Sequence, residues 1–165
     1  MRLTTEDIAL VKKTLDGISL FKYFTPAENE KLMEAFDKVP MRKGQVLIEQ
    51  GAPGSIFYIV ASGAVAVVRK REFVDKKVST LQAGEFFGEM SLINNEPRNA
   101  AVVCEEDGVL VTLFRDTFRN IILANPHVAQ EIMRIASQRK EEILDIEAED
   151  RLQRYRAKNE PPPQR

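Results

Sequence analysis

Short apolar runs occupy the middle of the chain, and helical patterns occupy both ends. Six of the eight glycines fall between residues 44 and 88 and separate short β-branched segments. Glycine tolerates the positive φ that turns and corners require. The expected strands are 45–48, 56–60, 64–68, 77–81, 100–103 and 108–113. Short strands at this spacing predict an antiparallel sandwich, jelly roll or barrel.

Both flanks of this β segment show helical spacing. Apolar positions predict a helix at about 5–15, and Thr25-Pro26-Ala27-Glu28 forms a capping box with proline at the first helical position. Asp116 is expected to cap a short helix, and Asn125-Pro126 begins a long one with an apolar stripe over 128–146. The predicted fold class is therefore α+β, mainly β: an antiparallel β-roll flanked by N-terminal helices and a long C-terminal helix.

These patterns divide the chain into four segments. We expect an N-terminal helical segment over 1–24, a β-roll over 25–124, a C-terminal helix over 125–155 and a flexible tail over 156–165. Residues 151–165 carry five basic side chains and one acidic side chain. Pro161-Pro162-Pro163 cannot continue a helix, which favours a frayed end.

Composition excludes several classes of function. The 24 basic and 25 acidic residues give a net charge of -1, without the basic excess typical of nucleic-acid binding. One cysteine and one histidine exclude an intrachain disulfide and any metal site with two histidine ligands. We expect no metal, no catalytic residues and no enzyme activity.

The sequence also lacks the features of a secreted or membrane-spanning chain. The N-terminus has no signal-peptide pattern, and the longest mainly apolar stretch, 56–68, is shorter than the roughly 20 residues that span a bilayer. The prediction is a cytoplasmic protein with neither a membrane nor a nucleic acid as partner.

The segment 84–101 carries the most informative chemistry. Glu89 follows Gly88 directly, and Arg98 lies ten residues beyond that glycine. A glycine corner lets the backbone approach a ligand, and a helical turn beginning there aims N–H groups at an anion. A carboxylate can accept hydrogen bonds from a sugar, and a guanidinium can hold a phosphate by two parallel bonds. This pattern predicts a nucleotide-like ligand, with a purely structural Glu89–Arg98 ion pair as the alternative.

The same segment resembles the phosphate-binding cassette of cyclic-nucleotide-binding domains, which occur in the catabolite activator family, regulatory subunits of cyclic-AMP-dependent kinase and cyclic-nucleotide-gated channels. The resemblance rests on Phe87-Gly88-Glu89-Met90-Ser91-Leu92 and, five residues later, Arg98-Asn99-Ala100. Similar segments at 20–24, 48–51 and 57–63 extend it over about 20–144. The ligand-binding residues it implies are Phe87, Gly88, Glu89, Met90, Ser91, Arg98, Asn99 and Ala100.

The resemblance also implies a role for each part of the site. Glu89 would accept the ribose 2′-hydroxyl, and Arg98 would pair with the cyclic phosphate, helped by backbone N–H groups around Gly88, Ser91 and Asn99. The C-terminal helix would cover the base. The lid residues expected on that helix are Arg139, Ile143 and Leu144.

The implied function is a cyclic-nucleotide sensor that signals through movement of its C-terminal helix. In the family, threonine after the cassette arginine is linked to cyclic GMP, so Asn99 favours cyclic AMP, with cyclic GMP left open. The alternative is a protein-interaction module with a degenerate, ligand-free pocket. The downstream protein partner is unknown, and the apolar stripe on the long helix leaves a homodimer open.

Overall fold

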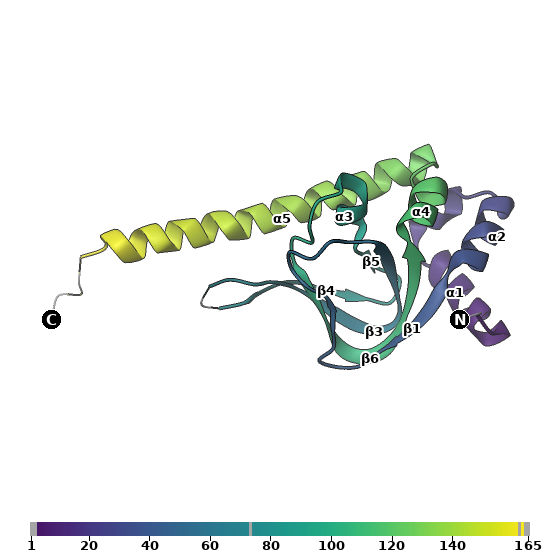
Figure 1. The fold of residues 1–165 in the computed structure, drawn as a ribbon, viewed down its shortest axis with the longest axis horizontal. Coiled ribbons are helices and arrows are strands. Elements are labelled where there is room, and N and C mark those ends of the chain that lie inside the picture. Colours follow the sequence, from purple (N-terminus) through teal and green to yellow (C-terminus); the bar gives the residue numbers. More distant parts are fainter. Residues whose placement is uncertain (1–2, 73, 162, 164–165) are drawn as a thin grey trace.

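The computed structural model describes residues 3–72, 74–161 and 163. A β-roll carries short helices at one end, and one long helix crosses it and extends beyond it (Figure 1). The helical elements are α1 (Thr5–Asp16), η1 (Ser19–Tyr23), α2 (Pro26–Ala35), α3 (Glu89–Asn94), α4 (Arg115–Thr117), η2 (Phe118–Ile122) and α5 (Pro126–Asn159). The strands are β1 (Asp37–Met41), β2 (Val46–Ile48), β3 (Ile56–Arg69), β4 (Lys76–Gln82), β5 (Phe86–Phe87) and β6 (Ala101–Phe114). This architecture confirms the predicted fold class.

Capping boxes begin both N-terminal helices. The predicted box at α2 is present, with Thr25 and Glu28 each accepting a hydrogen bond from the other's backbone N–H. The same reciprocal bonds join Thr4 and Asp7 at α1. Satisfying two otherwise unpaired N–H groups fixes where each helix starts.

The sheet is antiparallel, with strand order β1-β6-β3-β4; β2 pairs with β6, and β5 with β3. The prediction that residues 56–60 and 64–68 are separate strands is wrong, because both belong to β3. The same correction joins 100–103 and 108–113 in β6. At the crossing of these strands, Gly63 has a φ of 81°, and a Cβ on Gly108 would lie 2.1 Å from the Ser62 carbonyl oxygen. Both glycines permit a β-bulge and a close approach of the two backbones at this point. Each strand therefore bends and continues instead of ending in a turn.

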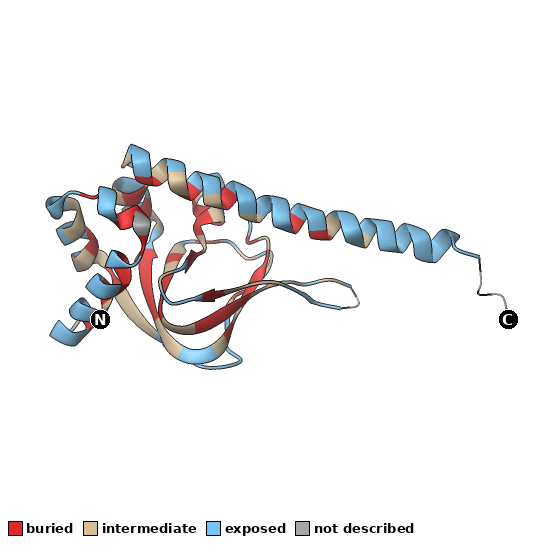
Figure 2. Ribbon diagram, turned by 180° about the vertical axis from the view of Figure 1, so that it is seen from behind, coloured by how far each residue is buried: buried red, intermediate tan, exposed pale blue. Residues whose placement is uncertain are grey.

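Two buried apolar clusters hold the roll and the helices together (Figure 2). The larger cluster joins α1, α2, α3 and α5 to strands β3, β5 and β6. It includes Leu32, Phe57, Leu92, Phe118 and Ile132. The smaller cluster fills the roll and includes Val60, Val65 and Leu110. The larger cluster fixes the corner of the roll that precedes α3 relative to the first half of α5.

The segment between β6 and α5 differs from the expectation. Asp116 does not cap a helix: α4 already begins at Arg115, and η2 continues as a turn of π-helix. Asn125 caps α5 as predicted, accepting hydrogen bonds from the N–H groups of His127 and Val128.

The long helix α5 extends to Asn159, four residues past the expected end of the C-terminal helix. Residues 162, 164 and 165 of the expected tail lie outside the described residues. Across the part of the chain that the structure describes, no helix combines the length and apolar character of a membrane span.

Candidate ligand pocket between the roll and α5

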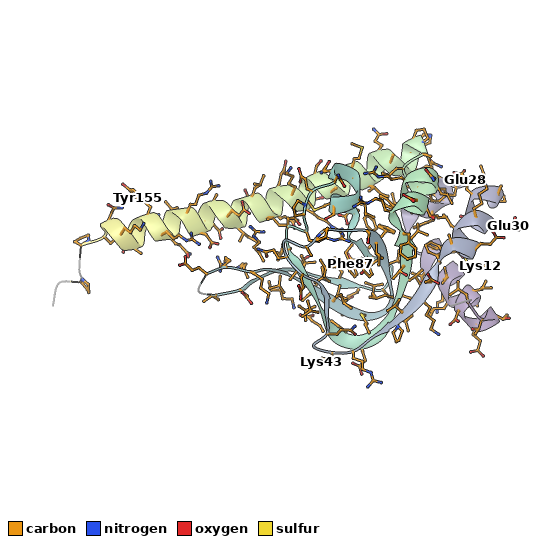
Figure 3. The ribbon with its side chains drawn as sticks, viewed as in Figure 1. Lys12, Glu28, Glu30, Lys43, Phe87 and Tyr155 are labelled. Atoms are coloured by element: carbon orange, nitrogen blue, oxygen red, sulfur yellow. The ribbon has the colours of Figure 1, made fainter. Side chains whose placement is uncertain are left out.

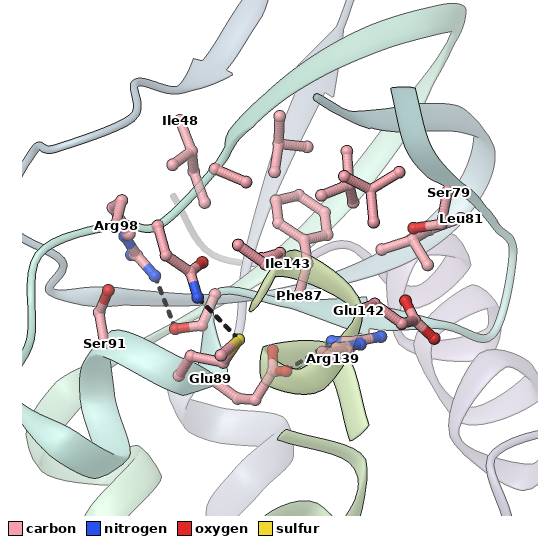
Figure 4. A pocket seen from close by; sticks show the side chains of 17 residues that line it. Ile48, Ser79, Leu81, Phe87, Glu89, Ser91, Arg98, Arg139, Glu142 and Ile143 are labelled. Carbon is pink, nitrogen blue, oxygen red and sulfur yellow. Dashed lines mark hydrogen bonds and ion pairs between the residues drawn. The ribbon is translucent and has the colours of Figure 1, made fainter. Parts of the chain in front are cut away.

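A pocket of about 60 Å³ lies between the β-roll, α3 and α5 (Figure 4). Strand residues form its apolar wall, and charged side chains from the cassette and α5 face it from other sides (Figure 4). Arg139, Glu142 and Ile143 of α5 form one side of this pocket. A ligand bound there would therefore lie directly against α5.

A glycine corner positions the cassette. Gly88 has a φ of 87° in the left-handed region and forms the N-cap of α3, directly after β5 pairs with β3. A Cβ on Gly88 would lie 2.9 Å from the Ile56 carbonyl oxygen and 3.0 Å from Arg98 Nη1. Both the backbone angle and the space therefore require glycine at this position.

The Arg98 backbone and side chain are both held in place. Its carbonyl accepts from Gly51 N–H at 2.6 Å, and its N–H donates to the Ala52 carbonyl at 2.8 Å. The guanidinium donates from Nη1 to the Gly88 carbonyl at 2.6 Å and from Nη2 to the Ile56 carbonyl at 2.9 Å. Arg98 is 7% exposed, so the sheet and the cassette corner hold its charge in one place.

The charge of Arg98 is not balanced by an ion pair. Among the described residues no carboxylate lies within salt-bridge distance of its guanidinium, which contacts two neutral carbonyl oxygens. Burial lowers the pKa of Arg98, while interactions with Tyr58 and Glu89 act in the opposite direction. Arginine nevertheless remains protonated in proteins. A buried cation with only neutral partners gains from binding an anion.

Glu89 is paired, but with α5 rather than with Arg98. The residue is 1% exposed, and its Oε1 accepts from Arg139 Nη1 at 2.7 Å. Arg139 Nη2 also donates to the Phe86 carbonyl at 2.7 Å, and the guanidinium lies 5.0 Å from the centroid of the Phe86 ring. The structural Glu89–Arg98 ion pair considered as an alternative is therefore absent. Arg139 fastens α5 to the cassette instead.

The structure brings nearly all the predicted site residues together. The eight cassette residues predicted to bind ligand all line the pocket, as do Arg139 and Ile143 on α5. Leu144 is the exception, because it lies one residue, or about 100° of helical rotation, beyond Ile143. It is 47% exposed and does not line this pocket, so its place in the lid stays a prediction.

The apolar wall and one acidic group were not predicted. These lining residues are Ile48, Val67, Val78, Ser79, Leu81, Val102 and Glu142. The strand residues among them come from β2, β3, β4 and β6 and face the pocket from the roll. Alternation alone gives the inner face of a strand, but it does not distinguish a pocket wall from ordinary core.

Comparisons with known proteins agree with this geometry. The cyclic nucleotide-binding domain family matches residues 38–125. The cAMP-dependent protein kinase regulatory subunit of Aspergillus fumigatus is 34% identical over 108 residues, which are 66% of this chain and 26% of the relative. The cGMP-dependent protein kinase of Toxoplasma gondii is 33% identical over 144 residues, which are 86% of this chain and 14% of the relative.

A solved structure shows the same fold with ligand. The regulatory domain of Toxoplasma gondii PKA, crystallised with cAMP, superposes with a TM-score of 0.73 at 26% identity, covering 81% of this chain and 51% of that one. The fold, the cassette and the match over more than half of the chain define a regulatory, ligand-binding class of domain. This chain belongs to the cyclic nucleotide-binding domain family, and it spans about a quarter or less of the two kinase proteins compared above.

Proposed function

We propose that this chain is a cyclic-nucleotide sensor that binds cyclic AMP in preference to cyclic GMP and signals through the position of α5. The observation that carries the proposal is the buried Arg98 guanidinium, whose hydrogen-bond partners in the described part of the chain are two neutral carbonyls. A cyclic phosphate supplies the missing negative charge and accepts two parallel N–H bonds. We assign the protein no catalytic step.

The ribose is proposed to bind at Glu89. Its Oε1 accepts from Arg139, and the second carboxylate oxygen can accept a hydrogen bond from the 2′-hydroxyl. Asn99 lines the pocket beside the cassette, and the absence of threonine at this position underlies the preference for cyclic AMP. The base then occupies the space between the apolar wall and α5.

Ligand binding and the position of α5 are linked because the ligand and α5 would occupy neighbouring space in the pocket. Arg139 and Ile143 line the pocket from α5, and in the proposed complex the nucleotide displaces this part of the helix. A ligand that binds only when α5 is displaced shifts the population toward that arrangement. The partner that reads this change is proposed to be a protein that contacts α5.

The outer face of α5 offers a surface for such a protein or for a second copy of the chain. Leu144, Leu152 and Tyr155 are 47%, 49% and 66% exposed, and Tyr155 projects from the part of α5 beyond the roll (Figure 3). Their spacing places them on one helix face. Sedimentation velocity of the wild type and of Leu152→Glu, with and without cyclic AMP, tests the homodimer.

Calorimetric titration with cyclic AMP, cyclic GMP and the non-cyclic 5′-AMP tests the sensor function. We expect saturable binding of cyclic AMP, weaker binding of cyclic GMP and the weakest binding of 5′-AMP. A matching rise in melting temperature with cyclic AMP follows from mass action. If neither cyclic nucleotide binds or raises the melting temperature, the alternative of an interaction module with a degenerate pocket is correct.

A further inference from the structure

The β3–β4 hairpin contacts α5 beyond the pocket through three ion pairs, which we call the hairpin latch. Arg69 Nη2 lies 2.5 Å from Glu147 Oε1, Arg71 pairs with Asp150, and Arg154 Nη2 lies 3.5 Å from Glu72 Oε2. In Figures 1 and 2 the hairpin extends beside the distal half of α5. The three α5 positions are spaced at 147, 150 and 154, so they share the helix face turned toward the hairpin.

The latch is more than a set of solvated surface charges. The side chains of Arg71 and Asp150 are each only 19% exposed, which limits the screening that makes exposed pairs weak. Arg71 also donates from Nε to the Val74 carbonyl at 2.9 Å, which restrains its side chain within the hairpin. The Arg71–Asp150 ion pair is therefore partly buried, and the Arg71 side chain in it is restrained.

One latch residue also contacts the cassette. Arg69 donates from Nη1 to the carbonyl of Asn99, the residue that follows Arg98. A single guanidinium thus bridges the predicted phosphate-binding segment and Glu147 on α5. The latch therefore contacts the predicted binding segment directly through Arg69. Arg71 and Glu72 do not line the pocket.

The geometry of α5 couples the latch to pocket occupancy. Ile143 lines the pocket, and Glu147 follows four residues later, about 6 Å along the helix axis. Residues 127–159 contain no glycine or proline, so this stretch lacks the residues at which helices usually kink. A shift of Ile143 by several ångströms carries Glu147 with it and takes the Arg69–Glu147 pair beyond the ~4 Å limit of an ion pair.

We propose that the hairpin latch holds α5 over the pocket and competes with the ligand. This inference rests on the proposed function for its effect on nucleotide affinity, whereas the contact between latch and helix is independent of any ligand. Loss of the latch lowers the cost of moving α5. It therefore tightens nucleotide binding, although the latch lies outside the pocket.

The test neutralises the α5 side of the latch and leaves the Arg69–Asn99 bond intact. We expect Glu147→Gln combined with Asp150→Asn to bind cyclic AMP about three- to tenfold more tightly, as the loss of two partly buried pairs implies. Backbone amides of 147–159 should exchange hydrogen faster in the absence of ligand. The readouts are calorimetry and hydrogen-exchange mass spectrometry on the full chain.

A matched control removes the same amount of charge from the same helix. Glu141 and Glu149 have no ion-pair partner among the described residues, so Glu141→Gln combined with Glu149→Gln should leave both affinity and exchange at wild-type values. Charge reversal provides the rescue. Arg71→Glu should accelerate exchange in α5, and adding Asp150→Arg should slow it again.

The two readouts separate the possible failures. Wild-type exchange over 147–159 in the neutralised variant would show that the latch does not hold α5. Faster exchange with unchanged or weaker cyclic AMP affinity would overturn the competition with ligand. If no protein in the set binds a cyclic nucleotide, the proposed function and the competition both fail, and the exchange data still decide whether the latch holds α5.

Discussion

Removal of the Arg98 side chain is the most direct test of the site. In the closed pocket Arg98 donates to the carbonyls of Gly88 and Ile56, and in the proposed complex its fork of donors turns to the cyclic phosphate. A hydrogen bond to a charged group contributes about 1.5–3 kcal/mol. Arg98→Ala should therefore weaken cyclic AMP binding by more than ~100-fold, which corresponds to about 2.7 kcal/mol.

Arg98→Lys separates charge from geometry. Lysine keeps the positive charge but lacks the planar fork that holds phosphate by two bonds. We expect an intermediate loss of about tenfold, or about 1.4 kcal/mol. A loss in Arg98→Lys as large as that in Arg98→Ala would show that the fork, rather than the charge, provides the binding energy.

Folding must be measured alongside binding, because Arg98 also satisfies two carbonyl groups. Their loss should destabilise the unliganded protein by about 2 kcal/mol, and a melting-temperature drop of about 4–8 °C follows for a chain of this size. Titrations below the melting range keep the variant folded. Arg134→Ala is the control, because its side chain is 62% exposed on α5. Wild-type affinity in folded Arg98→Ala would refute the assignment.

Three further predictions follow from neighbouring contacts. Glu89→Gln should weaken cyclic AMP binding by about tenfold in calorimetry, less than Arg98→Ala, because a neutral amide still accepts one bond. Gly88→Ala should destabilise the protein by about 1–3 kcal/mol in thermal melts, because its φ is 87° and the new Cβ would crowd Ile56. At α1, a hydrogen bond from Lys38 is the largest cause that lowers the pKa of Asp7 to about 2. Since the folded pKa lies below the unfolded value, this stability is present above about pH 4 and is lost as the pH falls toward 2, so urea titrations of Asp7→Asn should show a smaller acid-side loss than the wild type.

The sequence predicted correctly those helix starts that depend on contacts between residues close together in the chain. The capping box at Thr25 and Glu28 and the Asn125 cap involve residues two or three apart, and the structure contains both. The strand boundaries failed at Gly63 because a glycine marks a turn and a bulged crossing equally well. The difference depends on β6, whose Gly108 lies 45 residues away in sequence and approaches the Ser62 carbonyl. No window around Gly63 contains that information.

The pocket shows the same difference between short-range features, which the sequence predicted, and long-range contacts, which it did not. The spacing of Glu89 and Arg98 predicted that both would lie at one corner, and both line the pocket. The partners of these charges came only from the structure. Glu89 binds Arg139, 50 residues later, and Arg98 binds two backbone carbonyls. Gly54 was a missed signal, because a Cβ there would lie 2.5 Å from the Arg98 guanidinium carbon.

The buried charges of Glu89 and Arg98 have different partners. This difference explains how one ligand could bind in the pocket and also move α5. Glu89 pairs with Arg139 of α5, whereas Arg98 donates to two backbone carbonyls of the roll and the cassette corner. In the proposed complex, a cyclic nucleotide would supply an anion to Arg98 and a hydroxyl to the second carboxylate oxygen of Glu89. A nucleoside without phosphate would supply the hydroxyl but no anion for Arg98. The phosphate should therefore provide most of the free energy that offsets the displacement of α5, and the ribose and base should set how far the helix moves.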